Sequence, residues 1–274
     1  MRGLRRPEVT SIQETEKIYS ELEQRADQEL REIGPSLRDL AHRIVNEKPD
    51  TIIFLDVSAR IFGTPFMQYL TERMGADAPQ VRFYNDDKLK GAYLEHGSES
   101  VDAVVTHDLQ DLVGKKLFFV DETFSNGKGA AAIYSAKDAL GGNIFYTALS
   151  VDPDPPTGEF DSYGKSEIEH AAVLKQISAD PHFIFYDNPL QTVFSREASR
   201  LYMTDSAQRK LNPYEARSVR RAKGDSTIPH ILDMHRPPKG MTMEEYDRKI
   251  RELSHHAAES IKRKIYATLA NKSD

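Results

Sequence analysis

Short apolar runs alternate with helix-like stretches through the middle of the chain. Six runs are candidate strands: TIIFL (51–55), VRFY (81–84), VDAVV (101–105), KKLFFVD (115–121), NIFYTALSVD (143–152) and, less regular, HFIFYD (182–187). Helical spacing is clearest at 64–74 and at about 128–140. Short runs of this kind between helices are typical of parallel strands that are buried on both faces. We therefore expect an α/β fold, with a parallel sheet of about five strands and helices on both faces.

Both ends of the chain carry helical patterns instead of strand patterns. Residues 10–48 predict two helices separated at Gly34-Pro35, and residues 242–271 predict one long polar helix with acids in its first turn. The sequence is accordingly divided into three parts. They are an N-terminal helical cap (1–48), an α/β core (49–190) and a helical C-terminal extension (191–274).

Composition narrows the classes of function. The chain has 274 residues, a net charge of −6 and no cysteine, which excludes disulfides, thiolate catalysis and cysteine-ligated metals. The acidic balance argues against a general nucleic-acid binder, although the basic segment 209–223 is a candidate contact for nucleic acid or for a protein partner. No run approaches the ~18 apolar residues of a membrane span, and the basic N-terminus lacks the apolar segment of a secretory signal. We expect a cytoplasmic protein with no membrane partner.

The stretch FFVDETFSNGKGA (118–130) concentrates the chemistry. Two acids follow an apolar run, and a small glycine-containing turn then opens a helix. The nucleotide loop GxxxxGK[ST] does not fit, because Glu122 stands at its first glycine and Gly129 at its hydroxyl position. The dinucleotide motif GxGxx[GA] does not fit either, because DETFSN (121–126) stands between the apolar residues of the strand and Gly127. A plain strand-to-helix turn, with acids that favour the helix dipole, is the structural alternative.

Two acids followed by a Ser-x-Gly turn resemble the PRPP-binding loop of the type I phosphoribosyltransferases. The resemblance covers roughly residues 50–152. It implies that Asp121 and Glu122 hold the ribose and steady the positive charge that develops at its anomeric carbon. It also implies that the 5′-phosphate is bound by the turn, namely Thr123, Ser125, Asn126, Gly127, Lys128 and Gly129.

The same resemblance assigns further loops. The family binds diphosphate after its first core strand, which places Asp56, Ser58, Ala59 and Arg60 there, with Arg60 able to make bidentate contacts. The family also has a flexible loop between its second and third strands; the matching stretch is 85–102, with Lys88 and Lys90 as candidate diphosphate contacts. Asp152, at the end of a predicted strand, is a candidate for the acceptor side.

The function that the resemblance implies is that of a phosphoribosyltransferase, a transferase of the glycosyltransferase class. It would bind Mg²⁺·PRPP or a nucleotide and release diphosphate, with an acceptor that stays open. The resemblance implies that Mg²⁺ enters with PRPP and not on protein ligands. The histidines, for their part, show no spacing typical of a metal site. Two alternatives remain: a non-catalytic PRPP- or nucleotide-sensing or assembly module on the same fold, and an effector that cleaves the glycosidic bond of nucleotides. A homo-oligomer or a protein partner stays open for each of these functions.

Overall fold

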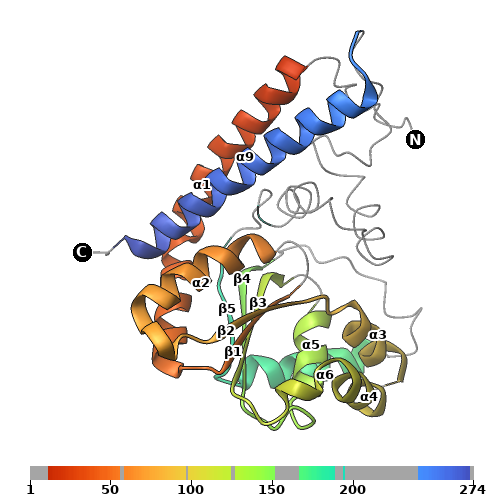
Figure 1. The fold of residues 1–274 in the computed structure, drawn as a ribbon. Helices are drawn as coiled ribbons and strands as arrows, with labels where there is room; N and C mark the ends of the chain where they lie inside the picture. Colours follow the sequence, from red (N-terminus) through yellow and green to blue (C-terminus); the bar gives the residue numbers. More distant parts are fainter. Residues whose placement is uncertain are drawn as a thin grey trace.

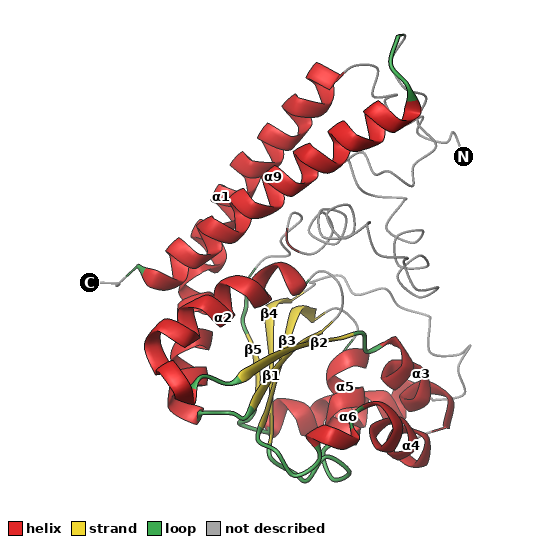
Figure 2. Ribbon diagram, viewed as in Figure 1, coloured by secondary structure: helices red, strands yellow, loops and turns green. Residues whose placement is uncertain are grey.

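Five parallel strands form a single sheet at the centre of the protein (Figures 1 and 2). The computed structural model describes residues 12–55, 59–96, 98–124, 127–151, 167–188, 194 and 240–271. The strands are β1 (Thr51–Leu55), β2 (Gln80–Tyr84), β3 (Leu117–Phe124), β4 (Ile144–Val151) and β5 (Phe183–Phe185). Their order across the sheet is β2-β1-β3-β4-β5. The prediction of an α/β fold with a parallel sheet of about five strands and helical additions is confirmed.

One face of the sheet is covered by four helices that follow β2, β3 and β4 in the chain. They are α3 (Asp87–His96), α4 (Ser98–Asp108), α5 (Lys128–Ser135) and α6 (Glu167–Ala179). The side chains of Ile53, Phe119 and Tyr146 point from the sheet into this layer, where they join one apolar cluster with residues of all four helices. Single 3₁₀ turns at Gly75–Asp77 and Gln110–Leu112 lead into β2 and toward β3.

The other face is covered by α2 (Arg60–Met74) and by the two long terminal helices, α1 (Ile12–Glu47) and α9 (Met243–Ala270). The helices α1 and α9 lie side by side and run parallel (Figure 1). Their contacts advance together along both helices: Tyr19 bonds to Ser254, and Asp27 pairs with Lys264 at 2.7 Å. The prediction of a long C-terminal helix is confirmed, and it begins with a capping box between Thr242 and Glu245.

The predicted break at Gly34-Pro35 is wrong, because α1 runs unbroken through both residues. Gly34 is a packing residue: a Cβ there would lie 3.1 Å from Thr268 Cγ2, so glycine lets α9 come close. Pro35 is exposed, on the side of the helix where a lost backbone hydrogen bond can be replaced by water. Tertiary packing of the apolar stripe therefore outweighs the local breaking signal.

The predicted strand at 101–105 is also wrong, because these residues belong to α4. Val101, Val105 and Leu109 are buried at the four-residue spacing of a helix face. The prediction of a loop at 85–102 fails with it, since α3 and the start of α4 occupy most of this stretch. None of the helices in the described part of the chain combines the length and the apolar character needed to cross a membrane.

Substitution of Ile261 by Ala tests whether α9 belongs to the same core as the sheet. Ile261 is fully buried in the cluster that includes Phe118 and Val120, so we expect a loss of about 2–5 kcal/mol in the free energy of unfolding. Urea unfolding followed by circular dichroism would measure it, in a single transition. The control is Arg263→Ala, an exposed position on the same helix, which should change stability by no more than about 0.5 kcal/mol. Equal losses in the two variants would contradict a core role for α9.

Candidate functional site

The strands β1 and β3 are neighbours at the centre of the sheet, and the helices that follow them leave on opposite faces. Phe54 of β1 is in register with Val120 of β3. The helix after β1, α2, packs with the terminal helices, whereas the helix after β3, α5, packs on the other side. This arrangement is the topological switch point of a doubly wound sheet, the place where such folds bind ligands beyond the strand ends.

The acids of β3 lie inside the strand and not at its end. The apolar run was expected to end at Asp121, but β3 continues to Phe124 and stays paired with β4, Asp121 opposite Ala148 and Thr123 opposite Ser150. Val120 is the last residue of β3 that pairs with β1, and β1 ends one residue later at Leu55, so only the last three residues of β3 extend past it. Because side chains alternate along a strand, Asp121 faces the layer of α5 and Glu122 faces the layer of α2.

Asp121 is held by a buried tyrosine of the neighbouring strand. The hydroxyl of Tyr146 donates a hydrogen bond to Asp121 Oδ2 at 2.8 Å, and Asp121 as a residue is only 8% exposed. Burial, and then the negative charge of Asp121, raise the pKa of Tyr146 well above its ordinary value. The phenol therefore keeps its proton at neutral pH and acts as a fixed donor to the carboxylate.

A second buried carboxylate lies close to the first. Asp86, just after β2, is fully buried and pairs with Lys90 Nζ at 2.6 Å. Gly129 in α5 brings the groups together: a Cβ there would lie 3.1 Å from Asp86 Oδ2 and 3.4 Å from Asp121 Oδ2. The residue after β2, the Asp121 position within β3 and the first turns of α3 and α5 thus meet in one charged cluster, which we call the Asp86–Asp121 cluster.

The turn into α5 depends on glycine. Gly127 caps the helix with a φ of 72°, in the left-handed region that glycine adopts without strain. A Cβ there would also lie 2.6 Å from Leu174 Cδ2. Lys128 is the first residue of the helix and is only 7% exposed. Ser125 and Asn126 lie outside the described residues.

The predicted diphosphate loop follows β1 at the same edge of the sheet. Ala59 is buried directly before α2, and Arg60 is the first residue of that helix, its guanidinium 5.8 Å from the centre of the Phe83 ring. Asp56 and Ser58 lie outside the described residues, as does Asp152, the candidate for the acceptor side.

The two lysines that were predicted on a flexible loop lie on α3 and point to different partners. Lys90 contacts Asp86 and therefore belongs to the Asp86–Asp121 cluster. Lys88 pairs with Asp108 of α4 at 2.9 Å. The helix α3 thus places Lys90 at the site, whereas Lys88 forms an ion pair with the neighbouring helix α4.

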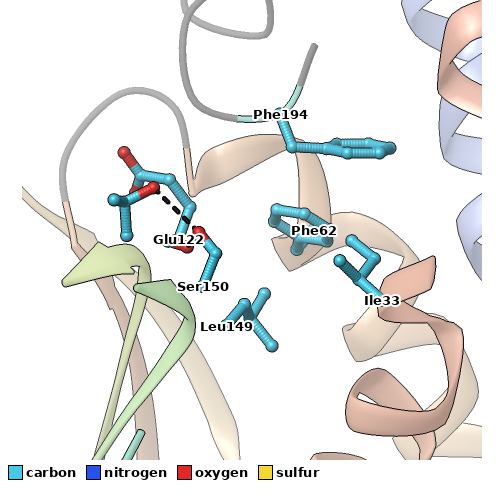
Figure 3. Close-up of a pocket in the computed structure, with 7 residues that line it drawn as sticks. Ile33, Phe62, Glu122, Leu149, Ser150 and Phe194 are labelled. Atoms are coloured by element: carbon cyan, nitrogen blue, oxygen red, sulfur yellow. Dashed lines mark hydrogen bonds between the residues drawn. The ribbon is translucent and has the colours of Figure 1, made fainter. Parts of the chain in front are cut away.

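On the other face of β3, Glu122 lines a small pocket (Figure 3). Its other lining residues come from four different elements and from the segment after β5: Ile33, Phe62, Thr123, Leu149, Ser150 and Phe194. The Ser150 hydroxyl donates to the backbone carbonyl of Glu122 at 2.8 Å and lies 3.2 Å from the Thr123 hydroxyl. The two acids predicted as one pair thus occupy different environments on either side of the strand.

Sequence reasoning missed Asp86 and Tyr146. Asp86 gave a weak signal, since it follows the apolar run VRFY in a polar stretch, as many loop residues do. Tyr146 looked like an ordinary strand aromatic, and only the register of β3 against β4 reveals its bond to Asp121. Within the described ranges no group of three or more His, Cys, Asp or Glu side chains is arranged to hold a metal ion.

Replacing Gly127 by Ala should destabilise the protein more than the same change at Gly142. Both glycines have positive φ, 72° and 80°, so both substitutions strain the backbone. The added methyl meets Leu174 and Phe124 at position 127, whereas nothing lies within 4 Å at position 142. We expect both variants to lose stability in urea unfolding, with the larger loss at 127. Equal losses would show that the turn tolerates a side chain at the helix start.

The bond between Tyr146 and Asp121 predicts how stability changes at high pH. The pKa of Tyr146 is raised in the folded protein, whereas tyrosine in the unfolded chain titrates near about 10. The unfolded state therefore loses its proton first, and the free energy of unfolding should fall as the pH rises above that value.

Substitution of Tyr146 by Phe should make this decline shallower and cost about 1.5–3 kcal/mol near neutral pH, where the bond to a charged group is lost. Urea unfolding at a series of pH values would measure both effects. Tyr134→Phe, a half-buried tyrosine of α5, is the matched control and should change the free energy little. A pH dependence identical to that of the wild type would contradict the assignment.

Comparison with known proteins gave no significant match to a protein-family model, to a curated protein or to a solved structure.

Proposed function

We propose that the protein binds a 5-phosphoribosyl compound, Mg²⁺·PRPP or a nucleoside 5′-phosphate, at the carboxyl ends of β1 and β3. It would transfer the phosphoribosyl group and, with PRPP as donor, release diphosphate. The observation that carries the proposal is the switch point itself. The two segments that resemble phosphate loops follow the two central strands, which are paired with each other and whose helices leave on opposite faces.

The turn before α5 is suited to a 5′-phosphate. The first N–H groups of a helix have no intrahelical partner and carry partial positive charge, so they bind anions. Gly127 holds the left-handed conformation that starts the helix, which glycine adopts without strain. Lys128 adds a positive charge at the same end of the helix.

The carboxylate of Asp121 is suited to the sugar. It lies in the strand that leads into the turn, with its Oδ2 atom 3.4 Å from the position that a Cβ would take on Gly129, and the hydrogen bond from Tyr146 fixes its orientation. Carboxylates accept hydrogen bonds from ribose hydroxyls. A fixed negative charge with little exposure to water also stabilises the positive charge that develops at the anomeric carbon.

The opposite end of the ligand would lie toward β1 and α2. Arg60 begins α2 and can neutralise a diphosphate with two parallel hydrogen bonds. Mg²⁺ belongs to this proposal as part of the Mg²⁺·PRPP substrate. The basic groups and the two acids together would bind a ligand that is anionic at both ends and a polyol in the middle.

A non-catalytic sensor on the same site is the second candidate. It is favoured by the parallel pair of α1 and α9, which extends past the sheet (Figure 1) and whose first turns are not needed to cover it. The two functions differ in one observable, since a sensor binds PRPP or a nucleotide without consuming it.

Thermal unfolding with ligands tests the proposed site. A ligand present at 100 times its dissociation constant should add about 2.7 kcal/mol to stability. We expect Mg²⁺·PRPP or a nucleoside monophosphate to raise the melting temperature of the wild type, and Asp121→Asn to lose that shift relative to its own unliganded value.

Asp111→Asn is the matched control, because Asp111 is an exposed residue paired with Arg82 at 2.5 Å. It should retain the full shift. If no ligand of the panel stabilises the wild type, the phosphoribosyl site is wrong. If Asp121→Asn keeps the shift, the sugar lies elsewhere.

A further inference from the structure

The pocket beside Glu122 bears on the acceptor of the proposed transfer. Figure 3 shows polar groups of Glu122 and Ser150 on one side and the side chains of Ile33, Phe62 and Phe194 on the other. The rings of Phe62 and Phe194 are 5.1 Å apart, and Phe194 donates its backbone N–H to Glu29 of α1 at 3.3 Å. The two rings of the apolar wall thus pack against each other, and a hydrogen bond joins Phe194 to the terminal helix α1.

The free space in this pocket is about that of one water molecule. A water requires a polar site with two to four partners, and the carboxylate of Glu122 and the hydroxyls of Thr123 and Ser150 provide them. A planar base is several times larger, and the contact between Phe62 and Phe194 leaves no gap for its insertion.

The hydroxyl groups are already oriented by the backbone. The Ser150 hydroxyl donates its hydrogen bond to the backbone carbonyl of Glu122 at 2.8 Å. In the 3.2 Å contact between the two hydroxyls, Thr123 is therefore the donor and Ser150 the acceptor. The remaining lone pairs of Thr123 can accept a proton from a water. A water that donates one hydrogen bond to Thr123 and the other to Glu122 keeps an oxygen lone pair available for attack.

The position of Glu122 connects this pocket to the sugar site. Consecutive strand residues have their Cα atoms about 3.8 Å apart and point to opposite faces. Asp121, level with Leu55 at the end of β1, and Glu122, one residue further on, therefore lie on opposite faces of β3 near its carboxyl end. A ribose held by Asp121 at this end would have the Glu122 pocket on its opposite side.

We propose that the acceptor of the phosphoribosyl group is water and that Glu122 is its general base, an inference that rests on the proposed function. The water oxygen bonds to the anomeric carbon as the bond from that carbon to the leaving group breaks. Diphosphate or a base departs with the electron pair. Glu122 takes one proton of the water and passes it to the leaving group or to solvent, and ribose 5-phosphate is the product.

Turnover without any added acceptor tests the inference. The wild type would be incubated with Mg²⁺·PRPP, and separately with AMP, GMP, CMP and UMP, and ribose 5-phosphate measured against a protein-free blank. The two arms distinguish a diphosphate from a base as the leaving group. Dissociation constants for the same compounds would be measured by titration calorimetry.

Glu122→Gln keeps the size of the side chain and removes the base, so ribose 5-phosphate formation should fall at least about 100-fold while the dissociation constant changes little. A merely structural role would leave the rate intact. Glu252→Gln, an exposed position on α9, is the matched control and should retain full turnover. If Glu122→Gln does not fold, Glu122→Asp keeps the carboxylate but withdraws it, and a loss of about tenfold to 100-fold is expected.

Binding by the wild type without formation of ribose 5-phosphate would overturn the inference and leave the proposed site standing. The same holds if base is released from a nucleotide only when diphosphate is added, or if Glu122→Gln turns over at the wild-type rate. Absence of binding to any probe would overturn the proposed function, and the inference with it.

Discussion

The parallel pairing of β1 with β3 is the constraint on which the rest of the structure depends. The carboxyl ends of parallel neighbours lie on the same side of the sheet. Each connection between such strands must therefore cross a face of the sheet, usually as a helix. The connection from β1 leads to the outer strand β2, whereas the later connections lead in the opposite direction, through β3 and β4 to β5. The helices of the two directions therefore cover opposite faces of the sheet. This pairing therefore brings the carboxyl ends of β1 and β3 close together, although α2, β2, α3 and α4 lie between the two strands in the sequence.

The terminal helices complete this arrangement. Phe118 and Val120 point to the face that α2 alone would cover incompletely, and α1 and α9 share one buried cluster with them. The parallel course of α1 and α9 brings polar contacts along the pair, such as Asp27 with Lys264. The helix α1 also contributes Ile33 to the pocket at Glu122. A chain segment far from the motif thus shapes the surroundings of the second acid.

Alternation along β3 gives the two acids separate roles in the site we propose. Asp121 is enclosed by Tyr146 and the first turn of α5, an environment that fixes a carboxylate in one orientation. Glu122 is half-buried beside hydroxyls and a small space. Two adjacent carboxylates on one face would repel each other, whereas opposite faces let each take different partners.

Local pattern predicted much of the fold. Four of the five strands of the sheet overlap predicted apolar runs, and the less regular run at 182–187 contains the fifth. The errors arose where local signals were ambiguous or overridden. A five-residue apolar run at 101–105 satisfies both strand and helix periods, and only its burial against α3 and α5 makes it helical. Gly34 does not break the helix; its missing side chain makes room for Thr268 of α9.

The sequence by itself determined the class of fold, the long C-terminal helix and the glycine turn after the acids. These features depend on periodicity, capping and backbone freedom, which are properties of neighbouring residues. Only the tertiary structure decided that β3 continues past its acids, that Tyr146 and Asp86 join Asp121, and that Glu122 faces a pocket of its own. Those features depend on strand register and on helices packed from distant parts of the chain, and no local pattern carries that information.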